Sequence, residues 1–235
     1  NSPYFYKGVR HHLIDVASSK RKFTVVRYQK LARKALHDIL KRGVVPIIAG
    51  GTGFYIDALL SGQVFPEVSP QPDLRRKFEK KSAEDLYHQL VLLDPDRART
   101  IDKDNKQRLI RALEIVITTG EVVPTLSKSD ISKSDFDMGS FDVLRIGFLV
   151  PRAELRKNIG RRLRERLKDG MVEEVRGLRE KIGLSWKRLD SFGLEYRYVS
   201  QYLQGLLTHE EMVDQLEREI CRYAKRQMTW FRRDK

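Results

Sequence analysis

Apolar residues recur every three to four positions between residues 24 and 41, and cationic residues fall between them. This period is typical of an amphipathic helix, and Gly43 follows where such a helix would end. Residues 44–49 form a short apolar run without polar alternation, as expected for a strand that is buried on both faces of a parallel sheet. A glycine turn at 50–53 and a helix over 54–60 come next. The order of strand, glycine turn and helix predicts an α/β fold.

The chain then changes to a stretch that reads as helices only. Three prolines lie close together at its start: Pro66, Pro70 and Pro72. The periodicity predicts helices over 73–80, 82–93 and 105–119, with a short turn from residue 95. Ser82 and Asp85 have nearly the spacing of a capping box, which indicates where the second of these helices begins. We therefore predict an all-helical insertion into the α/β fold.

The sheet domain is expected to resume after this insertion. Residues 127–137 are polar and predict a mobile loop, and residues 143–150 form a second apolar strand. The remaining pattern predicts helices over 154–168 and 172–181, a helix ending at 206, and a last helix over 208–230. The predicted domains are a discontinuous core, residues 1–67 and 138–235, and the insertion, residues 68–137.

The charge balance points to a class of partner. The chain has 46 Lys and Arg against 32 Asp and Glu, a net charge of +14, which favours nucleic acid first and an anionic membrane surface second. The sequence contains no run of about 18 apolar residues, the length needed to span a bilayer. Its first residues lack the charged region followed by an apolar region that is typical of a secretion signal. A cytoplasmic protein with no membrane partner is therefore expected. The single cysteine, Cys221, excludes an internal disulfide and a cysteine-based zinc cluster.

The glycine turn is the first candidate for chemistry. Glycines at 50, 51 and 53 would let a substrate approach the backbone, and the Thr52 hydroxyl would supply a hydrogen-bonding group. A tight turn without a ligand would use the same glycines, so the motif alone leaves both interpretations open. The P-loop pattern GxxxxGK[ST] occurs nowhere in the sequence. The five histidines are scattered, and the adjacent His11 and His12 would point opposite ways on an extended segment, so no metal site is expected.

Basic side chains on several predicted helices are candidates for phosphate contacts. Gln107, Arg108 and Arg111 share one helix face, which is either a binding face or a solvated face with ordinary ion pairs. The helix over 154–168 carries clustered arginines, which suit forked recognition of phosphate oxygens. Trp230, near the C-terminus, either stacks on bases or closes the core, and core closure is favoured.

Four segments, in this order, resemble the tRNA dimethylallyltransferase (tRNA isopentenyltransferase) family. They are His-His-Leu-Ile-Asp at 11–15, Val-Pro-Ile-Ile-Ala-Gly-Gly-Thr-Gly-Phe-Tyr-Ile at 45–56, Gln-Arg-Leu-Ile-Arg-Ala-Leu-Glu at 107–114, and Ala-Lys-Arg-Gln-Met-Thr-Trp-Phe-Arg-Arg at 224–233. The resemblance covers essentially the whole chain. It implies transfer of a dimethylallyl group from dimethylallyl diphosphate to the exocyclic N6 amine of the adenosine 3′-adjacent to the anticodon in tRNA. It also implies a P-loop-NTPase-like core with a parallel sheet, and a helical insertion that grips the anticodon stem-loop.

The resemblance assigns roles to particular positions. It implies that Thr52 touches the target nucleotide at the mouth of the reaction channel and that Arg162 contacts the substrate diphosphate. The positions that it implies for tRNA binding are Thr52, Arg75, Gln107, Arg108, Leu109, Ile110, Arg111, Phe192, Gly193, Leu194, Glu195, Tyr196 and Arg197. In the last of these segments this chain has Glu195-Tyr196 where the family has Gly-Tyr.

The family also has parts that do not precede His11 in this sequence. They are a P-loop that binds the diphosphate and Mg²⁺, and an Asp-Ser segment whose aspartate is the general base. The chain is therefore expected to be a fragment that lacks the N-terminal part of the core, the Mg²⁺ ligands and the base, and to be inactive by itself. Two alternatives stay open: a tRNA-binding remnant without chemistry, and an enzyme that prenylates free adenine nucleotides. Nothing in the sequence demands a dimer, so a monomer is expected.

Overall fold

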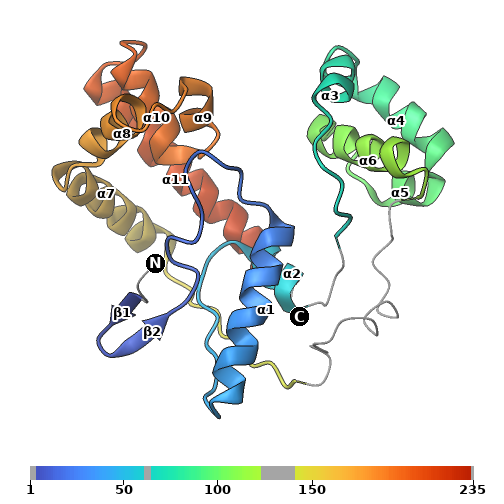
Figure 1. Ribbon diagram of the computed structural model, residues 1–235. Coiled ribbons are helices and arrows are strands. Elements are labelled where there is room, and N and C mark those ends of the chain that lie inside the picture. The colour runs from blue at the N-terminus through green and yellow to red at the C-terminus, as the bar shows by residue number, and fades with distance from the viewer. Residues whose placement is uncertain (1–3, 61–64, 123–140, 234–235) are drawn as a thin grey trace. The chain divides into compact units, whose positions relative to one another are not determined.

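The computed structural model describes residues 4–60, 65–122 and 141–233. The chain divides into two compact units, each with its own core (Figure 1). The first unit contains residues 1–24, 34–57 and 142–235, and the second contains residues 25–33 and 58–141. The predicted loop at 127–137 lies outside the described residues.

The first unit begins with a short hairpin that the sequence did not predict. Strands β1 (Tyr4–Tyr6) and β2 (Val9–His11) pair antiparallel, with Phe5 opposite Arg10. Lys7 and Gly8 connect them with φ values of 47° and 78°. Two consecutive residues with positive φ give the backbone twist that a two-residue hairpin needs.

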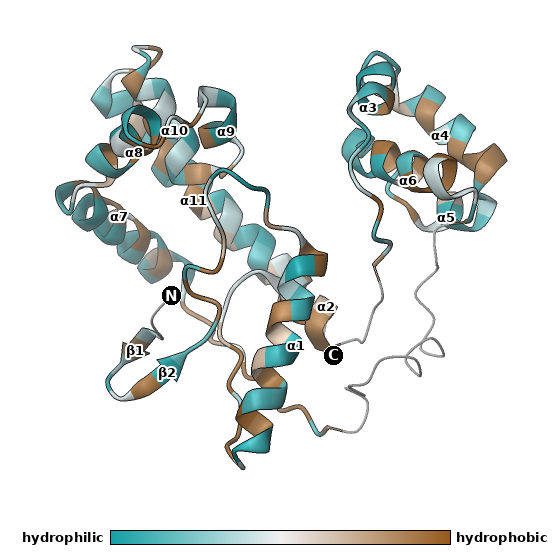
Figure 2. Ribbon diagram, in the orientation of Figure 1, coloured by the Kyte–Doolittle hydropathy of each residue, from teal (hydrophilic) through white to brown (hydrophobic). Residues whose placement is uncertain are grey.

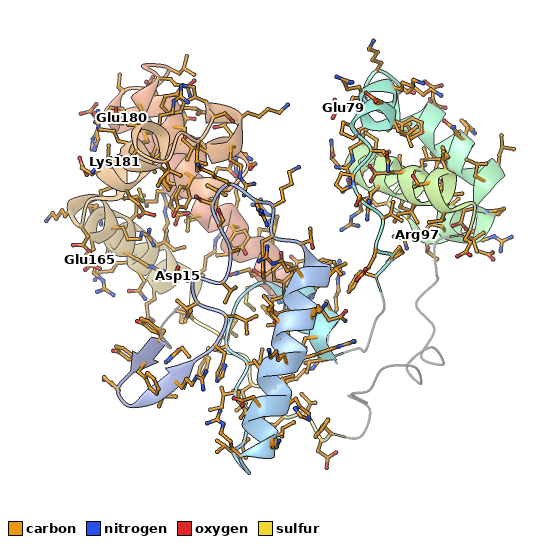
Figure 3. All side chains as sticks on the ribbon, in the orientation of Figure 1. Asp15, Glu79, Arg97, Glu165, Glu180 and Lys181 are labelled. Carbon is orange, nitrogen blue, oxygen red and sulfur yellow. The ribbon has the colours of Figure 1, made fainter. Side chains whose placement is uncertain are left out.

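Five helices form the core of the first unit. They are α7 (Arg152–Lys168), α8 (Met171–Glu180), α9 (Trp186–Asp190), α10 (Leu194–Leu203) and α11 (His209–Phe231). Leucines and other apolar side chains from all five helices or the turns beside them meet in one cluster, in which Val175, Val199 and Leu216 are fully buried. Figure 2 shows hydrophobic and hydrophilic stretches mixed along these helices, and the charged side chains of Glu165 and Glu180 lie on the outer sides (Figure 3). A capping box of Thr208 and Glu211 fixes the start of α11.

Four helices form the core of the second unit. They are α3 (Pro72–Glu79), α4 (Ala83–Leu93), α5 (Pro95–Thr100) and α6 (Lys106–Thr119). Leu86, Leu90 and Leu113 are fully buried among them. The expected capping box is present, since the Ser82 hydroxyl accepts from the Asp85 amide and the Asp85 carboxylate accepts from the Ser82 amide. The all-helical character predicted for this part of the sequence is confirmed for its described residues.

Two helices have residues in both units. They are α1 (Val25–Lys41) and α2 (Gly53–Leu60), and both form where the sequence predicted them. In the second unit, the side-chain amide of the buried Gln29 donates to the carbonyl of Ala58 over 2.6 Å. This bond joins the side chain of α1 to the main chain of α2.

The two predicted parallel strands do not form among the described residues. Residues 44–49 and 143–150 have no regular secondary structure, and the hairpin β1–β2 is the only sheet in the part of the chain that the structure describes. Ile47 and Phe148 expose 89% and 90% of their surface. A buried strand needs a neighbouring strand to pair its backbone groups and a layer to cover its side chains. The described residues supply neither, so an apolar run alone does not make a strand here.

Candidate functional site

The glycine turn presents Thr52 to solvent on a well-held backbone. Thr52 is exposed, whereas the neighbouring Gly53 is buried. The Thr52 carbonyl accepts from the amides of Tyr55 and Ile56 over 2.9 and 3.3 Å, so it begins helix α2. The hydroxyl can therefore meet a ligand while the main chain of Thr52 stays bonded to the helix.

Helix α11 contacts this turn through two side chains. The Gln227 amide donates to the carbonyl of Gly51 over 2.9 Å. The Trp230 indole N–H donates to the carboxylate of Asp57, in α2, over 2.8 Å. Trp230 is half-buried and meets Phe54 edge to face at 6.4 Å between ring centroids. Trp230 therefore packs against α2, which agrees with the favoured interpretation, although it belongs to neither described core cluster.

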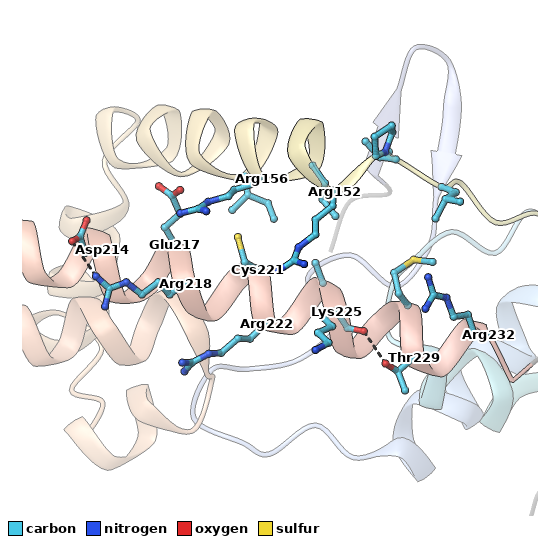
Figure 4. Close-up of a pocket in the computed structure, with 17 residues that line it drawn as sticks. Arg152, Arg156, Asp214, Glu217, Arg218, Cys221, Arg222, Lys225, Thr229 and Arg232 are labelled. Atoms are coloured by element: carbon cyan, nitrogen blue, oxygen red, sulfur yellow. Dashed lines mark hydrogen bonds and ion pairs between the residues drawn. The ribbon is translucent and has the colours of Figure 1, made fainter.

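A pocket of about 1070 Å³ lies between α7 and α11 (Figure 4). Six basic side chains and two acidic ones line it: Arg152, Arg156, Arg218, Arg222, Lys225, Arg232, Asp214 and Glu217. Apolar side chains complete the lining: Leu149, Val150, Pro151, Leu155, Ile159, Ala224 and Met228. In Figure 4, Arg152 and Arg156 extend from α7 toward α11. The excess of positive charge beside apolar walls suits an anion that carries an apolar group.

Arg162 lies one turn beyond Ile159 on α7 and is exposed. Three neighbouring arginines of this helix have a carboxylate within 4.0 Å: Arg161 with Glu165, Arg164 with Glu217, and Arg166 with Glu174. Arg162 has no such partner among residues 4–60, 65–122 and 141–233. A guanidinium without a carboxylate partner keeps its donors available for phosphate oxygens.

In the second unit, one carboxylate organises two predicted tRNA-binding arginines. The Glu114 side chain is fully buried and accepts two hydrogen bonds from Arg75, at 2.7 and 2.6 Å. It also accepts from Arg111 over 2.6 Å and from the amide of Gln71 over 2.7 Å. Burial raises the pKa of Glu114, but hydrogen bonds from Arg75, Gln71 and Arg111 outweigh it and lower the pKa to about 2. Glu114 is therefore ionised at neutral pH.

The predicted segment 107–111 divides into two kinds of position. Gln107 and Arg108 are exposed, so their side chains are available to a ligand. Leu109 and Ile110 expose 0% and 3% of their surface and pack in the core of the second unit. The structure corrects the expectation that these two side chains contact tRNA, because both lie on the broad face of α6 that packs into the core. The partly exposed Arg111 also donates to the carbonyl of Val68 over 3.0 Å.

The predicted segment 192–197 is a tight turn followed by the first turn of α10. Gly193, with a φ of 87°, precedes the helix, and Glu195 lies in its first turn. A carboxylate there is favoured by the positive end of the helix dipole, so Glu195 is compatible with this fold where the family has glycine. Leu194 has the unusual φ of 20°. Arg197 is exposed.

Phe192 and Tyr196 are held by neighbours in the first unit. Their rings pack edge to face at 5.3 Å, and the Arg188 guanidinium lies 4.5 Å above the Phe192 ring. The Tyr196 hydroxyl donates to Glu174 over 2.7 Å, and burial together with this bond raises the pKa of Tyr196 to about 12. Both rings line a smaller pocket of about 370 Å³. These contacts leave Arg197 as the most accessible charged group of the segment.

Two negative findings concern the described residues only. Within them, no three His, Cys, Asp or Glu side chains lie close enough together to hold a metal ion. No described helix is both long enough and apolar enough to cross a membrane.

Comparison with known proteins assigns the family. A model of the IPP transferase family matches residues 2–234. The chain belongs to this family. A "tRNA dimethylallyltransferase 2" of Citrifermentans bemidjiense is 38% identical over 97% of this chain and 70% of its own length. A "tRNA dimethylallyltransferase 2" of Treponema denticola is 40% identical over 97% of this chain and 75% of its own length.

Solved structures of tRNA prenyltransferases are similar in fold to this chain. The tRNA isopentenylpyrophosphate transferase of Bacillus halodurans is 31% identical, with a TM-score of 0.63 over 97% of this chain and 70% of that protein. A eukaryotic dimethylallyltransferase acting on tRNA gives a TM-score of 0.71 over 95% of this chain and 56% of that protein, at 22% identity. The mixed α/β class of these transferases agrees with the predicted α/β class, although the parallel sheet is absent from the described part of this chain.

The structure adds residues that the sequence analysis did not single out. Glu114 was not expected to organise Arg75 and Arg111, although an acidic residue among the apolar positions of the helix over 105–119 is a signal for a buried ion pair. Gln227 was not assigned a contact, because its partner on Gly51 lies 176 positions away. The pocket between α7 and α11 is likewise lined by two segments that are far apart in the sequence, residues 149–159 and 214–232.

Proposed function

We propose that this IPP transferase transfers a dimethylallyl group from dimethylallyl diphosphate to the N6 amine of the adenosine 3′-adjacent to the anticodon in tRNA. One observation carries this proposal: the family match over residues 2–234, together with relatives that are 38% and 40% identical over 97% of this chain. The net charge of +14 is consistent with a polyanionic substrate. Because tRNA is the acceptor, we place the reaction in the cytoplasm.

In this reaction the amine nitrogen forms a bond to the allylic carbon of the donor. The bond from that carbon to the diphosphate oxygen breaks, and its electron pair leaves with the diphosphate. The newly alkylated nitrogen of the adenosine then loses a proton to a general base, which we assign to no described residue. Target bases in single-stranded loops can be splayed out of the stack to reach such a site.

Two residues of the first unit receive catalytic roles in this proposal. Thr52 contacts the target nucleotide, and its exposure on a bonded turn supports this role. Arg162 stabilises the negative charge of the departing diphosphate, and the absence of a carboxylate partner within the described residues supports this role. The pocket between α7 and α11 has a basic and apolar lining that would suit a diphosphate with a short apolar chain, but neither Arg162 nor Thr52 belongs to that lining.

The tRNA contacts are proposed for exposed basic and polar side chains. Gln107 and Arg108 would contact the anticodon stem-loop directly. Arg75 and Arg111 would contribute their exposed edges, since Glu114 holds both. The segment 192–197 would contribute through Arg197 above all.

Mg²⁺ and a parallel sheet belong to the same proposal, but only the sheet can be assigned to residues of this chain. No group of three metal-ligating side chains occurs in the described parts of the chain, so we assign no Mg²⁺ ligand and route no step through the ion. Residues 44–49 and 143–150 are irregular in the described structure. We propose that they pair as strands of a parallel sheet in the full-length protein, because their exposed apolar side chains need a covering layer. The proposed domains are residues 1–67 and 138–235 for the core and 68–137 for the insertion.

The proposed function is tested by transfer itself. Full-length protein is incubated with dimethylallyl diphosphate and either unmodified tRNA or AMP, and the digested nucleosides are identified by mass spectrometry. Prenylated adenosine next to the anticodon is the expected product. Prenylation of AMP alone would indicate a nucleotide transferase, and tRNA binding without product by well-folded protein would indicate a binding protein.

A further inference from the structure

The glycine turn and the C-terminal helix are in close contact, and the contact explains residues of both. Neither Gly51 nor Gly53 has a positive φ, so backbone conformation does not require glycine at either position. A Cβ at Gly51 would overlap the Gln227 amide nitrogen, and a Cβ at Gly53 would overlap the Trp230 indole. The glycines are therefore needed for the close approach of α11.

Both side chains of α11 also donate hydrogen bonds to this turn and its helix. Gln227 bonds to the carbonyl of Gly51 and Trp230 bonds to Asp57, so the segment is held before and after Thr52. The carboxylate of Asp57 also lies 3.8 Å from the Arg145 guanidinium. The exposed Thr52 side chain is thus the part of the turn that remains available to a ligand.

We propose that Gln227 and Trp230 are positioning residues of the transfer reaction, which hold the Gly50–Gly53 turn against α11 and so fix the place of Thr52. This proposal rests on the proposed function, because it assumes that Thr52 contacts the reacting nucleotide. A displacement of about 1 Å at a reacting group can lower the rate on the order of 100-fold. Loss of either bond should therefore reduce turnover, whereas the tRNA contacts of the other unit should remain.

Gln227→Glu is the first test, because it keeps the shape of the side chain but replaces the N–H donor by a second oxygen facing the Gly51 carbonyl. In full-length protein we expect kcat to fall about 10- to 100-fold and KM for tRNA to stay within about twofold. Trp230→Phe removes the bond to Asp57 together with part of the ring that packs on Gly53 and Phe54, and should lower kcat as well. Gln204→Ala is the matched control, since this glutamine amide donates within α10 to Ser200 and contacts no proposed site.

A double mutant tests the contact itself. Gly51→Ala should lower kcat because its Cβ needs the space of the Gln227 amide. Gln227→Ala opens that space, so the double mutant should lose less than the product of the two single losses. Multiplicative losses, or a rise in KM for tRNA with unchanged kcat, would overturn the proposal. The second outcome would place Gln227 in direct contact with tRNA.

Hydrogen–deuterium exchange separates this proposal from the proposed function. The amides of Tyr55 and Ile56 bond to the Thr52 carbonyl, and their exchange should accelerate at least threefold in Gln227→Glu but not in Gln204→Ala. If wild-type protein transfers no prenyl group, the proposed function fails while this measurement still decides whether the turn is held. Faster exchange with unchanged kcat in an active enzyme would contradict a positioning role.

Discussion

At the scale of single residues, Glu114 shows how a buried charge acquires partners. Its carboxylate is fully buried, and three donors surround it: the two guanidinium groups of Arg75 and Arg111 and the backbone amide of Gln71. Removal of a partner from a buried ion pair costs more than the pair contributes, because an uncompensated charge stays behind. The same bonds fix the orientation of two arginines that we propose to contact tRNA.

Acid should therefore weaken the second unit through Glu114. Its pKa is about 2 in the folded protein against an ordinary value of 4.5, so the stabilisation is present above about pH 4.5 and is lost as the pH falls toward 2. Since Arg75 and Arg111 are about one-third exposed, we expect on the order of 2 kcal/mol rather than the full linkage value. Urea unfolding between pH 2 and 6 should show a shallower pH dependence for Glu114→Gln than for wild type. Equal slopes would mean that another carboxylate dominates.

Arg162 and Arg108 should differ in which kinetic constant they affect. Arg162→Ala removes a group that stabilises the departing diphosphate, so kcat should fall about 100-fold with little change in tRNA affinity. Arg108→Ala removes an exposed contact to the stem-loop, so KM for tRNA should rise several-fold with kcat preserved. Steady-state kinetics and filter binding with the same tRNA measure both effects. Equal effects on both constants would show that the two roles are wrongly assigned.

At the scale of elements, local signals predicted helices well and strands badly. The periodicity placed α1, α4 and α6 within one residue of their observed ends. Helix caps and amphipathic faces depend on residues that are near one another in the sequence, so a local pattern can predict them. The strands expected at 44–49 and 143–150 are absent, because a strand depends on partners that lie elsewhere. The five-residue helix α9 was missed, since it is too short to show a period. The same difference applies to the candidate site. Thr52 was singled out from a local glycine motif, whereas Gln227 contacts the turn only because the fold brings together residues 176 positions apart.

The capping box of α11 should contribute measurably to stability. The Thr208 hydroxyl accepts from the Glu211 amide, and the Glu211 carboxylate accepts from the Thr208 amide. Thr208→Ala should lower the free energy of unfolding by about 1 kcal/mol. Chemical denaturation measures this loss, and Glu210→Ala, at an exposed position of the same turn, is the control. A loss no larger than that of the control would show that burial of Met212 and Leu216 alone fixes the start of the helix.

At the scale of the whole molecule, positive charge is carried by both units. The first unit contains the arginine-rich helix α7, and the second contains Arg75, Arg108 and Arg111. Each unit has its own buried core, so surface charges in either can be changed without a direct effect on the packing of the other. Exposed charged residues that contribute to the net charge of +14 can therefore be substituted one at a time.

Binding of tRNA should consequently depend steeply on salt. Each phosphate that is neutralised by a cation releases a counterion, so the logarithm of affinity falls linearly with the logarithm of salt concentration, with a slope of about −0.7 to −0.9 per contact. Several contacts would weaken binding at least tenfold between about 50 and 200 mM salt. Arg108→Gln and Arg197→Gln should each reduce the slope by about one, whereas Glu210→Gln, which removes a negative charge outside the proposed interface, should leave it unchanged. A flat dependence for the wild-type protein would mean that the basic surface does not bind the tRNA backbone. An unchanged slope in both arginine variants would instead place the interface on other cations, among which those of the pocket between α7 and α11 are the next to vary.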